Sequence, residues 1–310
     1  MVGAGGARPG ARRGPGGGPV IVFCGYANLD VVARVPRLPR PDERVHATAV
    51  EHLPGGMAAN AAVAAARAGA RVAFAGVVGD DHLSGRFLGE LEAEGVDTSW
   101  TERTAFLSTA VVLVDAHGRR AVVSQDDGLG PAHVAAAARR LVAEGGGLLY
   151  LDGYRASTVA AAATAGLVLA VDLDGCDDRD QALAALHCAD HVVVGRRRLE
   201  RLLGHPGSDW AQLARSAGSC LLVTDGADGW QLFAPDGSTV PGAALPVAVV
   251  DDTGAGDCFA GTYLAGIDGG LPPVTAARRA GVAASLSCTV RGARGAPTPA
   301  DVDAVLAGPA

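Results

Sequence analysis

Short apolar runs alternate with alanine-rich segments along most of the chain, and this alternation predicts an α/β fold. The runs expected to form strands are Val20–Cys24, Val72–Val78, Leu148–Leu151, Leu167–Leu173, His191–Val194, Cys220–Thr224 and Ala248–Val250. The segments expected to form helices are Ala58–Ala68, Leu83–Glu94, Ala132–Glu144, Gln181–Leu186, Arg197–Leu203, Trp210–Ala217, Asp257–Ala265 and Pro273–Ser287. Near-continuous apolar strands between helices are typical of a mostly parallel sheet covered on both faces. Such sheets bind ligands at the carboxyl ends of their strands, so the turns that follow these strands are the candidate sites.

Two segments in the first half of the chain depart from this pattern. Residues 31–53 are extended, charged and interrupted by prolines, and residues 109–124 have the pattern of a hairpin around Asp115-Ala116-His117-Gly118. Apolar and polar residues alternate in both segments, which suits strands that are buried on one face only. We expect a small β lid over the main sheet; ordinary surface loops are the alternative.

The bulk composition limits both the number of domains and the class of function. The 310 residues suffice for one large α/β domain, which we place at residues 19–310 after a disordered leader at residues 1–18. A net charge of -7 and only 4% aromatic residues argue against nucleic-acid binding. The six cysteines lack metal-ligand spacing, and no apolar stretch is long enough to span a bilayer. We therefore expect a cytoplasmic protein with reduced thiols and no membrane partner.

The most informative segment runs from Val250 to Gly261. An apolar run, Leu245–Val250, is expected to be a strand that leads into the turn Gly254-Ala255-Gly256, and Asp257 begins a helix-forming stretch. Such a turn directs backbone N–H groups toward one point beside the positive end of a helix dipole, which makes an anion site. A carboxylate there suits a general base that takes a proton from a hydroxyl attacking a phosphoryl group. A helix cap is the alternative role for Asp257.

Two further segments offer groups for a polyhydroxyl ligand. Gly55 and Gly56 precede a helix, where paired glycines let a ligand approach the backbone, and the amide of Asn60 can both donate to and accept from a hydroxyl. Asp30, which lies close to Asn28 after the first strand, is a carboxylate in an otherwise neutral segment and suits two vicinal hydroxyls. A helix start and a turn are the structural alternatives.

A fourth segment ends the strand Cys220–Thr224 and contains two glycines, Gly226 and Gly229. Together with Thr224 these glycines suit the phosphates of a nucleotide. A hairpin turn is the alternative.

The order and spacing of these segments resemble the ribokinase-like, phosphofructokinase-B-type carbohydrate kinases over nearly the whole chain. Residues 55–79 match the N-terminal signature of that family, including Asn60. Residues 251–257 match the C-terminal signature except at Asp252, where Thr or Pro is usual. The resemblance implies a three-layer α/β/α fold with a mostly parallel central sheet and a small β-sheet lid.

The resemblance also implies a role for each matched residue. Asp257 matches the catalytic base, and the anion hole that neutralises the transferred phosphoryl group falls on Gly254, Ala255 and Gly256. Contacts to the sugar hydroxyls fall on Asn28, Asp30, Gly55, Gly56 and Asn60. The nucleotide-binding turn falls on Thr224, Gly226 and Gly229. Family members vary a substrate contact at the position of Asp152, which follows the strand Leu148–Leu151.

As cofactors the resemblance implies ATP and Mg²⁺. Some members also bind an activating monovalent cation, and Asp251 and Thr253, with residues 290–295, lie at the matching place, which makes them candidate K⁺ ligands. In some relatives the lid pairs two subunits, so the sequence is compatible with a homodimer through the lid.

One segment departs from the family pattern. Where relatives have Asn-x-x-Glu near the magnesium and the phosphates, this chain has Gly195-Arg196-Arg197-Arg198. Loss of the acidic residue weakens water-mediated magnesium binding, whereas arginines such as Arg198 can contact the nucleotide phosphates directly. A solvated basic helix start is the alternative for Arg196 and Arg197.

We therefore expect an ATP-dependent kinase that phosphorylates a hydroxyl of a small sugar, with an inclination toward a ketose. The inclination rests on apolar Met57, on the alanine-rich helix that carries Asn60 and on residues 288–297, which resemble ketohexokinase-type relatives. A nucleoside kinase is the first alternative, for which Phe106 is the aromatic candidate near the lid. A catalytically weak sugar-binding protein is the second. A dinucleotide-dependent oxidoreductase is less favoured, because no GxGxxG follows the first strand.

Overall fold

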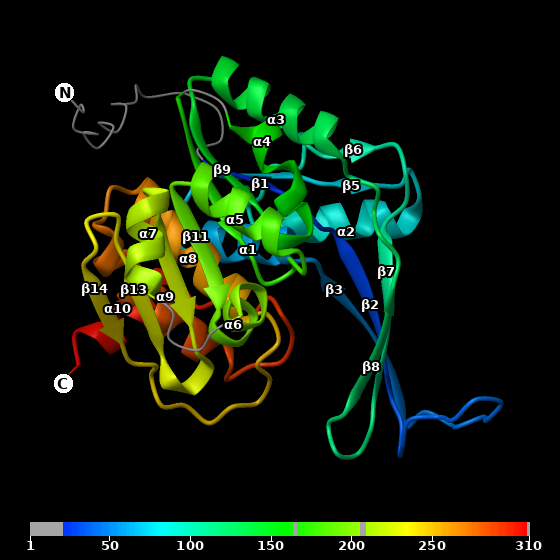
Figure 1. Ribbon diagram of the computed structural model, residues 1–310. Helices are drawn as coiled ribbons and strands as arrows, with labels where there is room; N and C mark the ends of the chain where they lie inside the picture. Colours follow the sequence, from blue (N-terminus) through cyan, green and yellow to red (C-terminus); the bar gives the residue numbers. More distant parts are fainter. Residues whose placement is uncertain (1–20, 164–165, 205–208, 309–310) are drawn as a thin grey trace, which may run out of the picture.

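The computed structural model describes residues 21–163, 166–204 and 209–308, so the predicted leader at residues 1–18 lies outside the described residues. The body is an eight-stranded sheet with the order β14-β13-β12-β11-β10-β9-β1-β4 and helices on both faces (Figure 1). Its strands are β1 Ile21–Cys24, β4 Val72–Ala75, β9 Gly147–Leu151, β10 Leu167–Asp172, β11 His191–Gly195, β12 Cys220–Thr224, β13 Trp230–Phe233 and β14 Thr239–Gly242. The strands from β4 to β12 are parallel, whereas β13 and β14 are antiparallel. The predicted α/β class with a mostly parallel central sheet is confirmed.

Two hydrophobic cores lie on the two faces of this sheet. Alternate residues of β1 enter different cores, Val22 and Cys24 on one side and Ile21 and Phe23 on the other, as the pleat of a strand requires. One core includes residues of α3 Pro131–Ala143, α4 Val159–Ala162, α5 Arg179–Cys188, α6 Arg196–Leu203 and α7 Trp210–Ala217. The other includes residues of α1 Met57–Arg67, α2 His82–Ala93, α8 Ala255–Asp268 and α9 Pro273–Ser287, and α10 Pro299–Leu306 packs on α9. This is the three-layer α/β/α arrangement.

A second, four-stranded sheet extends away from the body (Figure 1). Its order is β3-β2-β7-β8, with β2 Asn28–Arg34, β3 Ala49–Gly55, β7 Ser108–Val114 and β8 Arg120–Ser124. The two segments predicted at residues 31–53 and 109–124 therefore meet in one sheet, and β2 and β3 also reach back to residues 28 and 55. The buried carboxylate of Asp115 closes the turn between β7 and β8, because its Oδ1 accepts from His117 N at 2.9 Å and from Arg119 N at 3.0 Å.

Two of the predicted strands differ from the structure. Leu245–Val250, including the predicted strand Ala248–Val250, is not a strand: Val249 is 64% exposed, and the backbone N of Val250 pairs with Cys288 O beyond α9. The segment pairs with the loop after α9 and not with the edge strand β14, since Val250 N and Asp251 N both donate to Cys288 O. The run Val72–Val78 is divided into β4 and β5 Val77–Val78, and β5 pairs with β6 Glu102–Arg103.

The 3-10 helix η1 Gly153–Thr158, the short helix α4 after it, and α10 were not predicted from the sequence. None of the helices in the described part of the chain is both long enough and apolar enough to cross a membrane.

Candidate active site

Asp257 lies in the first turn of α8, directly after the glycine turn. Gly254 has φ +76, and a Cβ atom there would lie 2.4 Å from Ala293 O, so this turn requires glycine. The turn places the first N–H groups of α8 at the carboxyl edge of the sheet, where they can bind an anion. The N–H of Ala255 already donates to Asp252 O at 3.2 Å. The predicted anion hole therefore depends mainly on the N–H groups of its two glycines, Gly254 and Gly256.

The carboxylate of Asp257 is held by the amide of Asn60. Asn60 Nδ2, on α1, donates to Asp257 Oδ2 at 2.9 Å. The pKa of Asp257 is raised to about 7: burial is the largest cause, the hydrogen bond from Asn60 opposes the rise, and the negative charges of Asp174 and Asp152 add to it. The structure thus brings together two residues predicted for the site, Asn60 and Asp257. With a pKa of about 7, the carboxyl group of Asp257 can gain and lose a proton near neutral pH.

Asp174 is a site residue that the sequence prediction missed. It follows β10, and its Oδ1 accepts from Gly195 N at 2.8 Å. A Cβ atom at Gly256 would lie 3.7 Å from Asp174 Oδ2, so the carboxylate borders the glycine turn. Burial raises the pKa of Asp174, and the nearby charge of Arg198 lowers it. The signal was present as a second aspartate after an apolar strand, Asp172-Leu173-Asp174, but the strand was predicted to run through Leu173.

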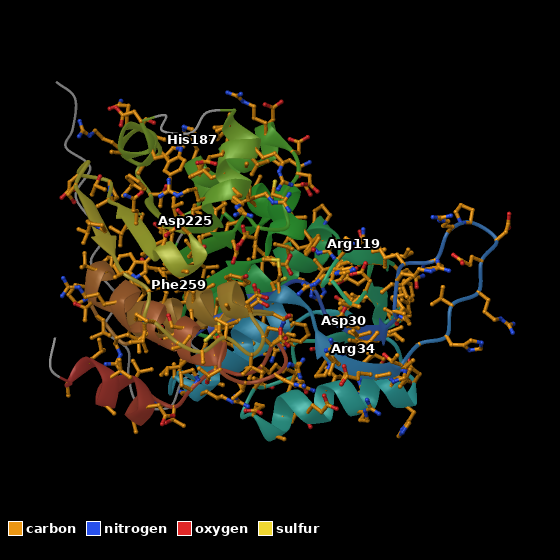
Figure 2. The ribbon with its side chains drawn as sticks, turned by 90° about the horizontal axis from the view of Figure 1, so that it is seen from below. Asp30, Arg34, Arg119, His187, Asp225 and Phe259 are labelled. Atoms are coloured by element: carbon orange, nitrogen blue, oxygen red, sulfur yellow. The ribbon has the colours of Figure 1, made fainter. Side chains whose placement is uncertain are left out.

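Three of the predicted sugar-binding residues form one cluster where the small sheet meets the body. Asn28 on β2 is paired with Gly55 on β3, and Asn28 Nδ2 donates to Asp30 Oδ1 at 2.6 Å. A Cβ atom at Gly55 would lie 2.6 Å from Asp30 Oδ2, so glycine leaves room for this carboxylate. Burial raises the pKa of Asp30, and the Asn28 hydrogen bond opposes that rise. Figure 2 shows Asp30 and Arg34 along the strand that leads from the body into the small sheet.

Gly56 precedes α1 with φ +96, and a Cβ atom there would lie 2.2 Å from Tyr26 O. Glycine is therefore required for the chain to pass Tyr26. This packing role stands beside the predicted contact to a sugar.

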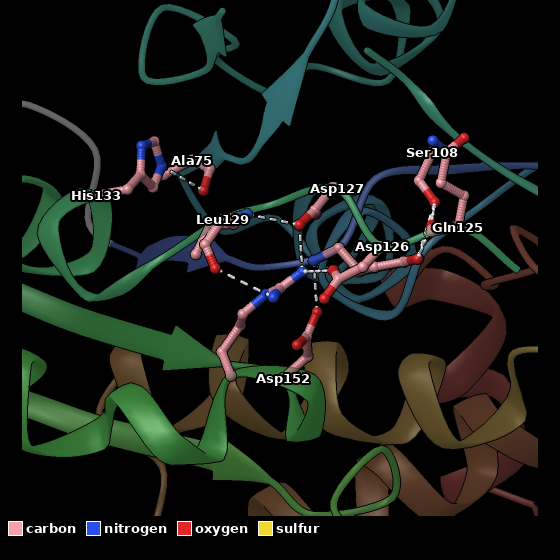
Figure 3. Close-up of polar contacts among 10 residues, drawn as sticks. Ala75, Ser108, Gln125, Asp126, Asp127, Leu129, His133 and Asp152 are labelled. Atoms are coloured by element: carbon pink, nitrogen blue, oxygen red, sulfur yellow. Dashed lines mark hydrogen bonds and ion pairs between the residues drawn. The ribbon is translucent and has the colours of Figure 1, made fainter. Parts of the chain in front are cut away.

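Asp152 is fully buried after β9 and fixes the turn that follows β1 (Figure 3). Tyr26 N donates to its Oδ2 at 2.5 Å, and a Cβ atom at Gly25 would lie 2.2 Å from the same oxygen. Burial raises the pKa of Asp152 to about 6. Its Oδ1 has no hydrogen-bond partner among the described residues, and neither has Oδ1 of Asn28. The carboxylate thus supports the turn beside the predicted sugar site and keeps one free acceptor.

An aromatic pair lies beside this turn and was also missed. The rings of Tyr26 and Tyr154 are 5.0 Å apart, and Tyr154 is 54% exposed. Tyr26 Oη contacts Ser108 Oγ at 2.8 Å and donates to Gln125 O at 2.5 Å, which ties the small sheet to the body. Sequence reasoning considered only Phe106, because nothing in the local pattern shows that Tyr154 stacks on a residue of another strand end.

The predicted nucleotide turn follows β12 at the same edge of the sheet, where Figure 2 labels Asp225. Gly226 begins the 3-10 helix η2 Gly226–Asp228 with φ +55, and a Cβ atom there would meet nothing within 4 Å. Gly229 is different, because a Cβ atom there would lie 2.1 Å from Gly242 O. Gly229 therefore allows β13 and β14 to pack, as the hairpin alternative requires, while Thr224 and Gly226 remain open to a ligand.

The arginines at the start of α6 differ in their surroundings. Arg196 pairs with Asp225, donates to Gln231 Oε1 at 3.0 Å and lies over the Trp210 ring, so it fixes the end of β12. Arg198 pairs with Asp177 and donates to Cys176 O at 3.1 Å. Arg197 is exposed. The solvated alternative is therefore wrong for Arg196, and binding of nucleotide phosphates by Arg198 stays a prediction.

The predicted cation ligands lie behind the glycine turn. Asp251 Oδ1 accepts from Thr253 N at 3.1 Å, and its Oδ2 accepts from Gly292 N at 3.0 Å. The loop after α9 therefore does lie against Asp251. The described residues contain no group of three or more His, Cys, Asp or Glu side chains placed to hold a metal ion.

This arrangement agrees with the comparisons with known proteins. A family model described as "pfkB family carbohydrate kinase" matches residues 20–301. The chain is 33% identical over 306 residues to the ATP-dependent ribose-1-phosphate kinase of Halopiger xanaduensis, with 93% of this chain and 97% of the relative covered. It is 35% identical to the fructokinase of Klebsiella pneumoniae, with 76% of this chain and 84% of the relative covered.

Among solved structures, the Arabidopsis thaliana ribokinase complexed with ribose and ATP superposes with a TM-score of 0.78 at 25% identity. That match covers 94% of this chain and all of the ribokinase chain, 100%. The chain therefore belongs to the pfkB family of carbohydrate kinases, which are ATP-using enzymes of the ribokinase fold.

Proposed function

We propose that this kinase transfers the γ-phosphoryl group of ATP to a hydroxyl of a small sugar, with Asp257 as the general base. The observation that carries the proposal is the position of Asp257, which is held by Asn60 Nδ2 at 2.9 Å and lies in the first turn of the helix that begins at the glycine turn. A base and an anion site then face the same space. That is what in-line attack of a hydroxyl on a phosphoryl group needs.

In this mechanism Asp257 accepts the proton of the attacking hydroxyl. A base with a pKa of about 7 is partly ionised at neutral pH and still has a high proton affinity, which is the compromise that general-base catalysis favours. The N–H groups at Gly254 and Gly256 stabilise the negative charge on the transferred group. Thr224 and Gly226, at the end of β12, hold the nucleotide. Arg198 is close enough to Asp174 to lower the pKa of that carboxyl group.

The donor set fits Mg²⁺ that arrives with ATP. Mg²⁺ keeps several waters and is usually held through one or two carboxylates in addition to the phosphates. Asp174 borders both Gly195 and Gly256, so it supplies the carboxylate that residues 195–198 lack. When bound, the cation neutralises charge on the phosphates.

The proposed acceptor is a small polyhydroxyl compound. Asp30 is a half-buried carboxylate, and Asn28 Oδ1 and Asp152 Oδ1 are buried acceptors without partners in the described part of the chain. Buried acceptors of this kind are costly unless a ligand or a water satisfies them. They therefore suit sugar hydroxyls, and ribose, ribose-1-phosphate and ketoses such as fructose are the first compounds to test.

A nucleoside is the second candidate acceptor. The observation that favours it is the exposed Tyr154 ring, 5.0 Å from the Tyr26 ring and beside Asp152. Aromatic rings provide stacking surfaces for bases. The same ring also suits the apolar face of a sugar, so the choice depends on the measured acceptor.

We also propose that the small sheet is a lid and that it pairs with a second copy of the chain. Strand pairing places mostly apolar residues on the sheet face opposite Asp30. We call seven of them the outer lid face: Val31, Ala33, Val50, Val111, Leu113, Ala121 and Val123. Leu29, Pro54, His52 and Thr109 lie on the same side of the sheet. Val123 is 74% exposed and Val50 is 56% exposed. An apolar face of this kind favours a partner of the same character, and in a homodimer the same face meets itself.

A monovalent cation would lie at Asp251 and Thr253 and would act on the glycine turn through the backbone between them. Asp251 already accepts two backbone hydrogen bonds there, which places its charge next to the turn. Activity with and without K⁺ tests this.

The experiment that tests the proposed function is an ADP-release assay with MgATP. The acceptors are ribose, ribose-1-phosphate, fructose, tagatose, sulfofructose, 2-keto-3-deoxygluconate, adenosine and pseudouridine. We expect turnover on one class of acceptor and a loss of about 10²–10⁴-fold in Asp257→Asn, with ligand-induced thermal stabilisation retained. Asp252→Asn, at an exposed neighbouring position, is the control.

Turnover in Asp257→Asn close to that of the wild type would exclude Asp257 as the base. Stabilisation by a sugar without turnover on any acceptor would instead favour the catalytically weak binding protein.

A further inference from the structure

Arg294 is a mostly buried cation that lies behind the candidate active site. Its side chain is 11% exposed, and its guanidinium lies over the Phe87 ring, 5.0 Å from the centroid. Nε of Arg294 donates to Asn60 Oδ1 at 3.3 Å. Nη1 of Arg294 lies 3.8 Å from Glu90 Oε2. A buried guanidinium is costly, and the assigned roles of this family site do not account for this one.

The loop that carries Arg294 is itself fixed. Arg67 Nη1 donates to Arg294 O at 2.7 Å and to Ala296 O at 2.9 Å. Arg67 is also paired with Glu94, Nη2 to Oε1 at 2.7 Å. These hydrogen bonds from Arg67 fix the backbone at Arg294, and so they fix the position from which its guanidinium contacts Asn60.

Arg294 determines how the amide of Asn60 is oriented toward Asp257. A guanidinium can only donate, so the amide must turn its oxygen toward Arg294. The amide nitrogen then has to face the other way, and there it donates to Asp257 Oδ2 at 2.9 Å. Without Arg294, the amide could rotate by half a turn and place its oxygen against the carboxylate, where two acceptors repel each other.

We propose that Arg294 is a positioning residue for phosphoryl transfer: by binding Asn60 Oδ1 it fixes the orientation in which the Asn60 amide donates to Asp257. This inference rests on the proposed role of Asp257 as the base. It assigns to residue 294 a function in the reaction although Arg294 itself touches neither the base nor the glycine turn in the described contacts.

The proposal has a consequence for the ionisation of Asp257. The groups that interact with Asp257 from the packed elements are Asn60 on α1, Asp152 after β9, Asp172 and Asp174 at and after the end of β10, and Tyr150 and Tyr154. Of these, the Asn60 amide opposes the rise in the pKa of Asp257, whereas the carboxylates of Asp152 and Asp174 add to it. Loss of the oriented amide should therefore raise this pKa and move the acid limb of the activity profile to higher pH.

The test is the pH profile of kcat/KM in Arg294→Met, which keeps the bulk of the side chain and removes its donors and charge. We expect the acid limb to move up by about one pH unit, the shift that corresponds to loss of one hydrogen bond to a charged group. Because the ionised fraction of Asp257 at pH 7 then falls from about one half to about one eleventh, we expect kcat at that pH to fall about fivefold, with KM for ATP unchanged. Arg294→Lys, which keeps a charged donor, should restore part of the shift.

A double-mutant cycle with Asn60→Ala separates positioning from a general loss of structure. If Arg294 acts through Asn60, Arg294→Met should not move the limb further in the Asn60→Ala background. Should Arg294→Met fold poorly, the same cycle with Arg294→Lys serves. Glu90→Gln is the matched control, because it removes the ion pair of Arg294 and leaves its contact with Asn60; its limb should match the wild type.

Two results would overturn the positioning role. In the first, the acid limb of Arg294→Met lies at the same pH as that of the wild type. In the second, Arg294→Met moves the acid limb by the same amount whether residue 60 is Asn or Ala. Failure of the proposed function gives a different result. In that case Asp257→Asn keeps both its turnover and its acid limb, whatever Arg294 does.

Discussion

Asn60 Nδ2 lies 2.9 Å from Asp257 Oδ2, although the two residues are 197 positions apart in the chain. Their helices, α1 and α8, approach closely because small residues face each other. A Cβ atom at Gly261 would lie 2.2 Å from Ala61 O, so no larger residue fits between the two backbones. The alanine-rich composition of α1 thus has a direct consequence for the site: it brings the amide within reach of the carboxylate.

The first prediction concerns the pH dependence of turnover. Asp257 must be ionised to accept a proton, and its pKa is about 7, so kcat/KM should rise with pH through this region and level off above it. The check is a profile measured from pH 5 to pH 9 with ATP saturating. The residual activity of Asp257→Asn should lack this limb, and a wild-type limb below about pH 5 would contradict the assigned pKa.

Stability should change with pH in the opposite direction. The folded pKa of Asp257 lies above its ordinary value of 3.8, so the folded state binds this proton more tightly than the unfolded state does. The resulting stabilisation is fully present below about pH 4 and is lost as the pH rises through about 7. Asp257→Asn, which has no carboxylate to ionise, should therefore have a higher Tm than the wild type at pH 8 and no such advantage at pH 4.

The third prediction concerns magnesium. If Asp174 supplies the carboxylate for ATP-bound Mg²⁺, Asp174→Asn should raise the Mg²⁺ concentration for half-maximal activity about 10–100-fold. The titration belongs at pH 8.5, because loss of the Asp174 charge also lowers the pKa of Asp257 and would affect rates at neutral pH. Asp180→Asn, in the first turn of α5 and exposed, is the matched control. An unchanged magnesium requirement in Asp174→Asn would exclude this role.

The fourth prediction concerns the glycine turn. Gly254→Ala places a side chain at φ +76 and 2.4 Å from Ala293 O, so it should cost at least about 1–2 kcal/mol of stability and reduce turnover. Thermal unfolding and the ADP-release assay measure the two effects. Gly85→Ala in α2 is the control, since a Cβ atom there meets nothing within 4 Å and a helical alanine should stabilise by about 0.5–1 kcal/mol. Equal Tm values for Gly254→Ala and the wild type would contradict the assigned backbone strain.

The parts of this site differ in how well the sequence predicts them. Gly254 to Asp257 form a contiguous motif whose local conformation follows from its glycines, so a prediction from the sequence is possible. Asp174 and Arg294 are single residues in ordinary loops, and Tyr154 is a single residue in the short 3-10 helix η1. Their importance depends on which strand ends and loops become neighbours, and no local pattern encodes that. Asn60 is intermediate, because the motif locates it but only the packing of two helices gives it a partner.

The error at Leu245–Val250 has a related cause. The apolar residues there have the composition of a buried strand, and composition alone does not show whether a segment pairs with a sheet edge. Here β14 is the edge strand, but the N–H groups of Val250 and Asp251 donate to Cys288 O instead. Val249 and Val250 are left exposed beside the glycine turn, 64% and 56% respectively.

The last prediction concerns the outer lid face. In β8, Val123 belongs to this face and is 74% exposed, whereas its neighbour Val122 points to the opposite face, which carries Asp30. If two copies pair through the outer lid face, Val123→Asp buries a carboxylate in an apolar interface and should convert a dimer into a monomer in sedimentation experiments. Val122→Asp introduces the same charge one residue away and should leave the dimer intact, while raising KM for the acceptor. A wild-type chain that sediments as a monomer, or equal dissociation in both variants, would exclude pairing through this face. Because Asp30 lies on β2, between β3 and β7 of the same sheet, dissociation should also weaken acceptor binding in Val123→Asp.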